Sequence, residues 1–495
     1  MRKSDSPQIM DRRRFCALGT AAAAYSLHCG IVRGALRPSR PNMLFCFADD
    51  WSFGHAGVYG DPVIQTPTFD RVARQGVLFT HAFSATPSCT PSRAAVLTGQ
   101  APHRLEQGGN LFGFLPKRFP VYPDLLDSAG YTVGFARKGW GPVGSMPKGW
   151  DPGSLEAGGR TRNPAGPRFD NFADFLKFAP ADKPFCFWFG STDPHRPYKL
   201  GTGLSSGMNP AKVKVPPLWP DTPEVRGDIL DYYFAAQRFD RESGEMLNML
   251  EKTGQLQNTI VVMSGDNGWP FPRCKANLYD GGTRQPLAVS WPAGIKGGRV
   301  LDDFINLTDL APTFLEAAGL KPLPEMTGRS FFRLLTGDEK PGSRNTVFVE
   351  RERHASVRPG LVGYPIRAVR TTEFLYIRNF HPERWPAGDP DPEFFYGPYG
   401  DCDPGPTKQT LVSRQKEFPK QFELSFAKRP AEELYNVRQD PHNMTNLAAD
   451  PKYRSAKQKM RASLDRWMKG TADPRATGGG DPWDHYPYFG QVLKR

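Results

Sequence analysis

The chain has 495 residues, of which 39% are hydrophobic and 12% aromatic, with 50 glycines and 49 prolines. This composition suits a loop-rich globular protein that is long enough for one large domain and a smaller one. No run of eighteen apolar residues occurs, which excludes an internal transmembrane helix. The formal net charge of +13 favours anionic partners. Because no nucleic-acid-binding module is recognisable, a polyanionic sugar ranks ahead of nucleic acid.

The N-terminus carries paired arginines ahead of a short apolar segment. Arg12-Arg13-Arg14-Phe15 is followed by an alanine-rich stretch that ends at Ala24. This string resembles a twin-arginine export signal. We therefore expect residues 1–36 to be removed and the product to be periplasmic or secreted. The alternative is an N-terminal amphipathic helix.

A continuous apolar run of strand length, residues 42–48, ends in Asp49 and Asp50. Such a run is typical of a strand buried in a parallel sheet, where ligands bind at the carboxyl ends of the strands. Adjacent carboxylates at a buried edge repel each other unless a cation lies between them. The pair therefore indicates a cation site, with a solvated turn as the alternative.

The stretch from Ser88 to Gly99, S-C-T-P-S-R-A-A-V-L-T-G, has the pattern of a short helix that ends at a glycine. Cys89 then lies at the helix N-terminus, where free backbone N–H groups favour an anion. Arg93 follows one helical turn later and can point back at the same place. For a lone cysteine, the ordinary interpretation is a small buried apolar residue.

Three further apolar runs also end in polar residues. Residues 131–136 precede Lys138, residues 185–189 precede His195, and the β-branched run 259–263 precedes the sequence D-N-G at 266–268. We expect these ends to converge, because the carboxyl ends of parallel strands meet at one edge of a sheet. Taken singly, a surface lysine, a packed loop histidine and a common turn are the alternatives.

The rest of the pattern predicts an α/β protein with two parts. A large, mixed but mostly parallel central sheet flanked by helices is expected over residues 37–344, with its longest helix over 228–252. Beyond residue 345, short alternating strands precede an amphipathic helix over 453–468. Residues 345–495 are therefore expected to form a smaller α+β domain with an antiparallel sheet. Whether Cys274 and Cys402 pair is left open, as is the oligomeric state.

Taken together, these motifs resemble the type I, formylglycine-dependent sulfatases of the alkaline-phosphatase superfamily. The family signature C-x-P-S-R-x-x-x-L-T-G is matched at every fixed position from Cys89 to Gly99, and the resemblance runs from about residue 40 to about residue 470. It implies an alkaline-phosphatase-like fold and a sulfuric ester hydrolase. It also implies that a formylglycine-generating or sulfatase-maturing enzyme oxidises Cys89 to formylglycine, which supplies the nucleophile.

The resemblance assigns a role to each strand-end residue. A divalent cation, calcium or alternatively magnesium, would be bound by Asp49, Asp50, Cys89, Asp266 and Asn267. The expected catalytic residues are Cys89, Arg93, Lys138 and His195. In this assignment Lys138 contacts the sulfate, and His195 donates to a sulfate oxygen or protonates the leaving group.

Residues 269–290, W-P-F-P-R-C-K-A-N-L-Y-D-G-G-T-R-Q-P-L-A-V-S, resemble the N-sulfoglucosamine sulfohydrolases, or heparan N-sulfatases. By this resemblance Lys275 occupies the place of a sulfate-binding residue that is arginine in the animal members, and it keeps the charge without the bidentate geometry. His354, in R-E-R-H, is expected to help select the sugar, with a solvated histidine as the alternative. The predicted substrate is the N-sulfate of glucosamine in heparan-type glycans.

The chain departs from the family at one position. Sulfatases usually have K-x-H where this chain has Trp140 two residues after Lys138, so the base for sulfate release is open, with His55 and His103 as candidates. Alternative activities are an O-sulfatase acting on another sulfated polysaccharide or an aryl sulfate, and a phosphodiesterase or phosphonate hydrolase of the same superfamily. A non-enzymatic alternative, suggested by Trp140, is a polyanion-binding protein on a sulfatase scaffold.

Overall fold

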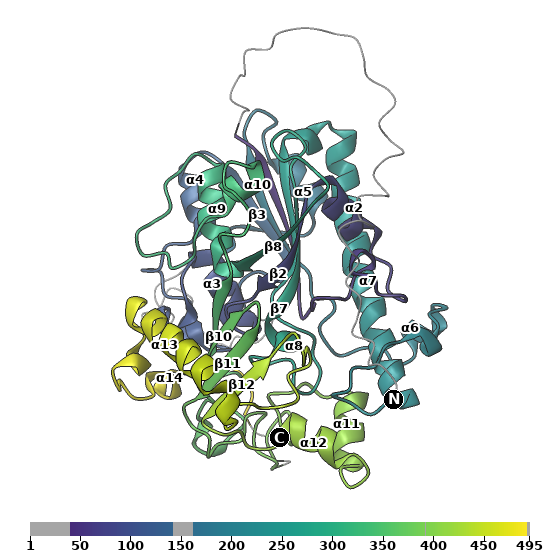
Figure 1. Ribbon diagram of the computed structural model, residues 1–495. Helices are drawn as coiled ribbons and strands as arrows, with labels where there is room; N and C mark the ends of the chain where they lie inside the picture. Colours follow the sequence, from purple (N-terminus) through teal and green to yellow (C-terminus); the bar gives the residue numbers. More distant parts are fainter. Residues whose placement is uncertain (1–39, 142–161, 392, 493–495) are drawn as a thin grey trace.

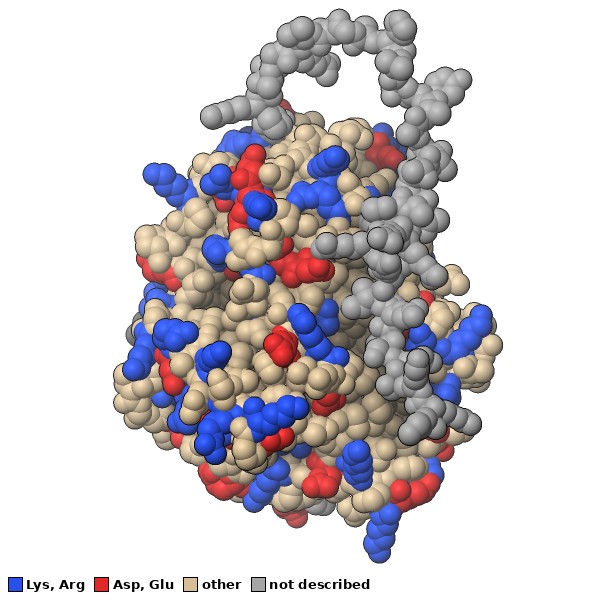
Figure 2. All heavy atoms as spheres, viewed as in Figure 1, with Lys and Arg blue, Asp and Glu red and all other residues tan. Residues whose placement is uncertain are grey.

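The computed structural model describes residues 40–141, 162–391 and 393–492 (Figure 1). The paired arginines and the rest of the expected export signal lie outside these residues. Among the described residues, no helix combines the length and the apolar character needed to cross a lipid bilayer. On the face seen in Figure 2, Lys and Arg side chains are spread among Asp and Glu side chains rather than gathered in one stripe.

The larger part is built on an eight-stranded sheet in the order β4-β3-β5-β1-β6-β7-β2-β8. In that order the strands are β4 (Arg168–Phe169), β3 (Thr132–Arg137), β5 (Phe185–Gly190), β1 (Asn42–Ala48), β6 (Thr259–Gly265), β7 (Arg284–Ser290), β2 (Val77–Phe83) and β8 (Arg299–Asn306). Only β7 runs against its neighbours in this sheet. The predicted mixed, mostly parallel sheet is therefore confirmed.

Both faces of this sheet are buried, which explains the continuous apolar runs. Alternate residues of β1 belong to two separate cores, with Leu44 on one face and Phe45 on the other. The first face is covered by α2 (Pro67–Gln75), α5 (Phe172–Phe178) and α7 (Pro223–Lys252). The second is covered by α3 (Cys89–Thr98), α4 (Tyr122–Ser128), α9 (Leu310–Ala317) and α10 (Phe332–Thr336).

The second sheet is antiparallel, in the order β12-β11-β10-β9. Its strands are β12 (Glu432–Asn436), β11 (Phe374–Asn379), β10 (Ile366–Thr371) and β9 (Thr346–Arg351). One face packs on α13 (Arg454–Gly470), and the other meets residues of the larger part such as Phe83 and Phe304. Shorter helices α6 (Thr202–Ser205), α8 (Asp280–Thr283), α11 (Pro406–Ser413), α12 (Pro419–Phe426) and α14 (Pro482–His485) lie in the connections. The predicted antiparallel sheet with its helix is confirmed, while a domain boundary at residue 344 stays a prediction.

A buried network of charges joins the two parts. Arg367, on β10, is fully buried and forms ion pairs with Asp473 at 2.6 Å, Glu352 at 2.6 Å and Glu350 at 3.0 Å. Glu350 also pairs at 2.8 Å with His103, which follows α3 in the larger part. Burial opposes the charged form of His103, but Glu350 outweighs burial and raises the pKa of the imidazole. Arg367 therefore balances the negative charge of buried carboxylates, one of which, Glu350, connects the second sheet to His103 in the larger part.

Replacing Arg367 with alanine is expected to lower the free energy of unfolding by about 3–5 kcal/mol, because it leaves buried carboxylates without their cation. The matched control is Arg378→Ala on β11, whose partner Asp465 is 43% exposed, and this pair is expected to contribute about 0–1 kcal/mol. Urea unfolding followed by circular dichroism measures both. Equal losses in the two variants would contradict a special role for Arg367.

Candidate active site

The polar residues that follow the central strands converge at one edge of the large sheet. Asp49 and Asp50 follow β1, which lies between β5 and β6. The backbone N–H of Asp49 donates to the carbonyl of Asp193 after β5 at 3.0 Å, and that of Asp266 after β6 donates to the carbonyl of Ala48 at 3.0 Å. The parallel register therefore fixes the three loops against one another, as the sequence pattern predicts.

Cys89 lies among the carboxylates at this edge. Its Sγ is 3.3 Å from Asp49 Oδ1 and 4.0 Å from Asp50 Oδ1. Asp50 adopts a left-handed backbone with φ of 71°, and its N–H donates to Asp266 Oδ1 at 3.0 Å. Candidate ligand atoms of Asp49, Asp50, Cys89 and Asp266 all lie within 4.8 Å of one another, and all four residues are buried. We call these four residues the Cys89 cluster.

Three basic side chains balance the charge of the cluster. Lys138 Nζ lies 2.5 Å from Asp49 Oδ2, Arg93 Nε lies 2.7 Å from Asp266 Oδ2, and Lys275 Nζ lies 2.8 Å from Asp50 Oδ2. Burial would raise the pKa of Asp49, but the basic side chains, Lys138 foremost, hold it well below its usual value. For Asp266, burial dominates over Arg93 and raises the pKa to about 6. The site thus holds alternating charges with little access to water.

The electrostatics of the site disfavour a thiolate at Cys89. Burial, followed by the nearby charge of Asp49, raises the pKa of the thiol well above its ordinary value. The residue opens α3, with Ser88 in an extended conformation before it, as the sequence predicts. Without a cation, the surroundings of an unmodified Cys89 therefore favour the neutral thiol, which is a weak nucleophile.

His195 faces the Cys89 cluster from the loop after β5. Its Nδ1 lies 2.5 Å from the carbonyl oxygen of Arg196. Because a carbonyl only accepts, Nδ1 carries the hydrogen and Nε2 remains free to act on a ligand. Nε2 is 3.8 Å from Asp50 Oδ2, and the ring lies within 4.8 Å of candidate ligand atoms of Asp49 and Cys89. The side chain is 33% exposed, so it lies on the open side of the site.

Asp403 joins the site from the second part of the chain, and sequence reasoning missed it. It lies in the loop before α11, and its Oδ2 is 2.8 Å from Lys275 Nζ. Together with Asp50 and His195 it forms a second group whose atoms lie within 4.8 Å of one another. Burial would raise the pKa of Asp403, but Lys275 and His195 hold it well below its usual value. Its sequence context, D-C-D-P-G-P, has only the features of a turn.

His354 also reaches this region, through the residue that precedes Cys89. Its Nδ1 is 2.8 Å from Ser88 Oγ, and the ring is buried. Burial lowers the pKa of His354 to about 3, with Asp401 opposing the shift. The solvated alternative is therefore excluded, while a role in sugar selection stays a prediction.

The position that departs from the family pattern lies in the hydrophobic core. Trp140 is buried and packs near Phe114. Both histidines considered as replacements for the missing base are held by other partners. His103 is bonded to Glu350 at 2.8 Å, and His55 is bonded to Tyr232 at 3.0 Å. The structure brings a different histidine, His195, close to the Cys89 cluster.

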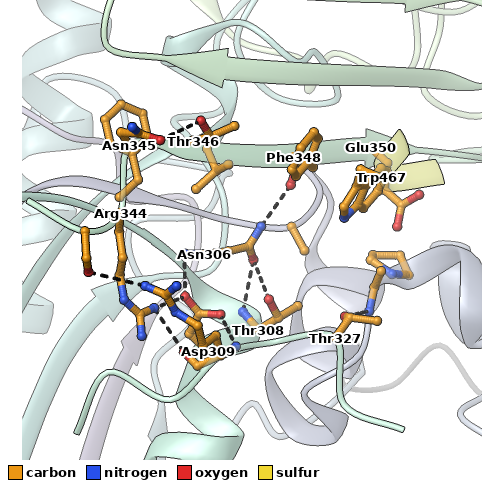
Figure 3. Close-up of a pocket in the computed structure, with 17 residues that line it drawn as sticks. Asn306, Thr308, Asp309, Thr327, Arg344, Asn345, Thr346, Phe348, Glu350 and Trp467 are labelled. Carbon is orange, nitrogen blue, oxygen red and sulfur yellow. Dashed lines mark hydrogen bonds and ion pairs between the residues drawn. The ribbon is translucent and has the colours of Figure 1, made fainter. Parts of the chain in front are cut away.

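A cavity of about 350 Å³ opens where the two sheets meet (Figure 3). It is lined by residues of β8, β9 and α13, and no residue of the Cys89 cluster lines it. Asn306, in its wall, donates from Nδ2 to the carbonyl of Phe348 at 2.9 Å and accepts at Oδ1 from the N–H of Thr308 at 3.0 Å. This cavity is separate from the Cys89 cluster, which remains the candidate active site.

Comparison of the sequence with known families gives two matches. The model of the sulfatase family matches residues 41–320, and the model of the N-sulphoglucosamine sulphohydrolase C-terminal region matches residues 265–401. The chain is 31% identical to N-sulphoglucosamine sulphohydrolase of Homo sapiens, over 90% of this chain and 93% of the human one. It is 28% identical to an ulvan-active sulfatase of Formosa agariphila, over 88% of this chain and 76% of that one.

Solved structures share the fold. One, described as a complex with its substrate D-glucosamine-2-N,6-O-disulfate, has a TM-score of 0.63 and 19% identity and covers 91% of this chain and 100% of that chain. A phosphonate monoester hydrolase from Silicibacter pomeroyi has a TM-score of 0.63 and 18% identity, over 88% of this chain and 96% of that one. At such identities the likeness shows the fold alone, and it agrees with the fold expected from the sequence.

The residues around Cys89 fit a hard divalent cation. Three buried carboxylates, those of Asp49, Asp50 and Asp266, offer oxygen donors of the kind that calcium and magnesium prefer. Among the described residues, Asn267 Oδ1 has no hydrogen-bond partner although it is buried, while its Nδ2 donates to Asp50 Oδ1 at 2.6 Å. A cation would satisfy this orphaned oxygen.

Adding Ca²⁺ to the metal-free protein is expected to raise the midpoint of thermal unfolding, because only the folded chain assembles the carboxylates. At a free-ion concentration a hundredfold above the dissociation constant, the stabilisation is about 2.7 kcal/mol. Asn267→Ala should reduce the gain, whereas Asn209→Ala, at an exposed position, should keep it. Differential scanning calorimetry measures the shift, and Mg²⁺ is compared under the same conditions. A midpoint that responds to neither ion would contradict the site.

Proposed function

Because the chain belongs to the sulfatase family and is a sulfuric ester hydrolase, we propose that it removes the N-sulfate of glucosamine in heparan-type glycans. Two similarities support this substrate. The human relative with 31% identity is named for this activity, and the C-terminal family match over residues 265–401 carries the same name. The observation that carries the proposal is the Cys89 cluster, with Lys138, Arg93 and Lys275 placed around it.

Two groups complete this proposed site. Formylglycine, made from Cys89 by a sulfatase-maturing enzyme, would supply a hydroxyl nucleophile, and Ca²⁺ or Mg²⁺ would stabilise negative charge on sulfuryl oxygens. Asp49, Asp50, Asp266 and Asn267 would hold the cation together with an oxygen of the modified Cys89. The neutral thiol expected for unmodified Cys89 supports this, because the site does not favour a thiolate.

The basic residues bind and orient the sulfuryl group. Arg93 Nη2 is buried and lacks a hydrogen-bond partner within the described structure. It is therefore the donor best placed to bind an anionic oxygen without losing an existing bond. Lys138 and Lys275 contribute positive charge next to Asp49 and Asp50, respectively.

His195 is the proposed proton donor to the leaving group. Its Nδ1–H donates to the carbonyl of Arg196, which leaves Nε2 facing the site, so the donor is the protonated imidazolium ring and the proton leaves from Nε2. An amine leaving group needs a proton as the sulfur–nitrogen bond breaks, and His195 is the partly exposed histidine beside Cys89. We also assign to His195 the proton transfer during sulfate release, for which the usual family histidine is replaced by Trp140.

The two-part division belongs to this proposal. Residues 37–344 would carry the chemistry, while residues 345–495 would complete the substrate pocket through His354 and Asp403. The leader, residues 1–36, would direct export to the periplasm or the medium, where sulfated glycans are accessible.

An O-sulfatase acting on another sulfated polysaccharide is the second candidate. It is favoured by the ulvan-active relative of Formosa agariphila, which is 28% identical over 88% of this chain. The chemistry at Cys89 would be the same, and the two candidates differ only in the group that leaves from sulfur.

Cys89→Ala is expected to lower kcat on a sulfated glucosamine at least about 10⁴-fold, because the residue that carries the nucleophile is lost. Cys186→Ala, which also replaces a buried cysteine with alanine, should keep kcat. Mass spectrometry of the peptide that contains residue 89, in protein from its own host, should show an aldehyde in place of the thiol. A wild-type protein that turns over substrate with an intact Cys89 thiol would overturn the formylglycine assignment.

Arg93→Lys is expected to lower kcat by about 10²–10³-fold, which is the usual effect of removing one preorganised donor to an oxyanion. Lysine keeps the charge but lacks Nη2, which makes no hydrogen bond to the described part of the chain and lies 3.8 Å from Asp49 Oδ1. Arg71→Lys is the matched control, because Arg71 is partly exposed and pairs with Glu251 on the surface. Steady-state kinetics on one sulfated substrate tests both. A kcat of the Arg93→Lys protein within threefold of wild type would remove Arg93 from the machinery.

A further inference from the structure

A fourth carboxylate, that of Asp403, lies beside the basic side chain of Lys275, which the sequence predicts to bind sulfate. The Asp403 carboxylate is 2.8 Å from Lys275 Nζ and lies within 4.8 Å of His195. Lys275 already has a carboxylate partner in Asp50, also at 2.8 Å, so Asp403 is not needed to balance this one cation. A carboxylate at this position repels an incoming sulfate unless the substrate offers it a hydrogen to accept.

The leaving groups of N-sulfates and O-sulfates differ in that respect. In an N-sulfate the atom bound to sulfur is a nitrogen that carries a hydrogen, whereas the bridging oxygen of a sulfate ester carries none. We propose that Asp403 accepts a hydrogen bond from the N–H of the sulfamate and thereby makes the site selective for N-sulfated over O-sulfated sugars; this inference rests on the proposed N-sulfatase function. The N–H stays on nitrogen, and His195 supplies the additional proton.

Exposure places Asp403 on the side of the site that a substrate reaches. The side chain of Lys275 is 2% exposed and that of Asp50 is not exposed at all. By contrast, Asp403 is 17% exposed and its neighbour His195 is 33% exposed. The proposed hydrogen-bond acceptor and the proposed proton donor are therefore the two partly exposed members of their group, beside the buried Asp50.

The carboxylate of Asp228 fixes the loops that carry His195 and Asp403 relative to each other. Asp228, buried on α7, accepts two hydrogen bonds from Arg196, at 2.7 and 2.8 Å. It also accepts from Thr407, at 2.7 Å from the hydroxyl and 3.1 Å from the backbone N–H. Arg196 is next to His195, and Thr407 is four residues after Asp403, so Asp228 ties the two loops together.

A glycine and a lysine hold the Asp403 loop in this position. A side chain at Gly405 would collide with the guanidinium of Arg196, so this close approach requires a glycine. Lys408 Nζ donates to the carbonyl of Cys402 at 2.7 Å and to that of Tyr399 at 3.1 Å. Asp403 is thus preorganised, which is a requirement for a residue that distinguishes two leaving groups.

The experiment compares kcat/KM for glucosamine N-sulfate and N-acetylglucosamine 6-O-sulfate, measured as released sulfate. Wild type should prefer the N-sulfate. Asp403→Asn should lower kcat/KM for the N-sulfate by about tenfold to a hundredfold, which is the usual effect of losing a hydrogen bond to a charged group. The value for the O-sulfate should stay within threefold or rise, because the repulsion is removed. Asp391→Asn, at an exposed position, is the control and should change neither value.

A second variant keeps the inference testable if the Asp403→Asn protein does not fold. Asp403→Glu keeps the charge and should keep a preference for the N-sulfate, although a weaker one. Equal losses on both substrates would overturn the inference, because they would make Asp403 a positioning residue for Lys275. A wild type that hydrolyses only the O-sulfate would also overturn it, along with the N-sulfatase proposal, and would leave the sulfatase activity standing. Hydrolysis of neither sugar by protein with the aldehyde at residue 89 would overturn the proposed function itself.

Discussion

The compensation of three buried carboxylates is the constraint on which the site depends. An ionised carboxylate without a partner costs several kcal/mol when it leaves water. Asp49, Asp50 and Asp266 are all fully or almost fully buried, yet each has a basic side chain within 2.8 Å. These basic residues come from three different segments, so the carboxylates are stable only when β1, β3, α3 and the loop after β6 are all in place. Assembly of the sheet and assembly of the site are therefore one event.

The sequence alone was sufficient to predict an element and its site residues where one short segment contains both the pattern of the element and the polar residues that follow it. The run over 42–48 is the strand β1, with the predicted bounds, because it is apolar on both faces and is ended by two carboxylates. The helix at Cys89 ends at Thr98, and Gly99 adopts a left-handed conformation with φ of 67°, as its C-terminal glycine indicates. The predicted convergence of strand ends also follows from local patterns, since parallel strands leave their carboxyl ends on one edge. The roles assigned to these residues remain proposals.

Contacts between distant segments were not predictable in the same way. Asp403 lies 128 residues beyond Lys275 and sits in a turn sequence that carries no signal of its own. Its place in the site depends on Asp228 and Gly405. Asp228 accepts hydrogen bonds from Arg196, and Gly405 leaves room for the Arg196 guanidinium, so neither role can be recognised before Arg196 is placed. Similarly, His103 was a candidate base only because of its proximity in sequence, but Glu350 on the second sheet accepts a hydrogen bond from its ring. In each case a contact between the larger part and the C-terminal part decides the role of a residue.

The residues proposed for the chemistry and those proposed for substrate selection come from different parts of the chain. The loops after the strands of the large sheet supply the three carboxylates and two of the basic side chains, Lys138 and Lys275. Their positions are fixed by the register of the strands. Asp403 and His354 come from connections of the second part, which can change in length and sequence without disturbing that register. His354 follows the seam between the two sheets, where Arg367 compensates Glu350, Glu352 and Asp473, whereas Asp228 on α7 ties down the Asp403 loop. A buried charge network is a suitable anchor for this purpose, because its directional bonds fix orientation more tightly than apolar packing does. Under the proposed function, the large sheet would present the groups for sulfuryl transfer, and Asp403 in the C-terminal part would select the leaving group.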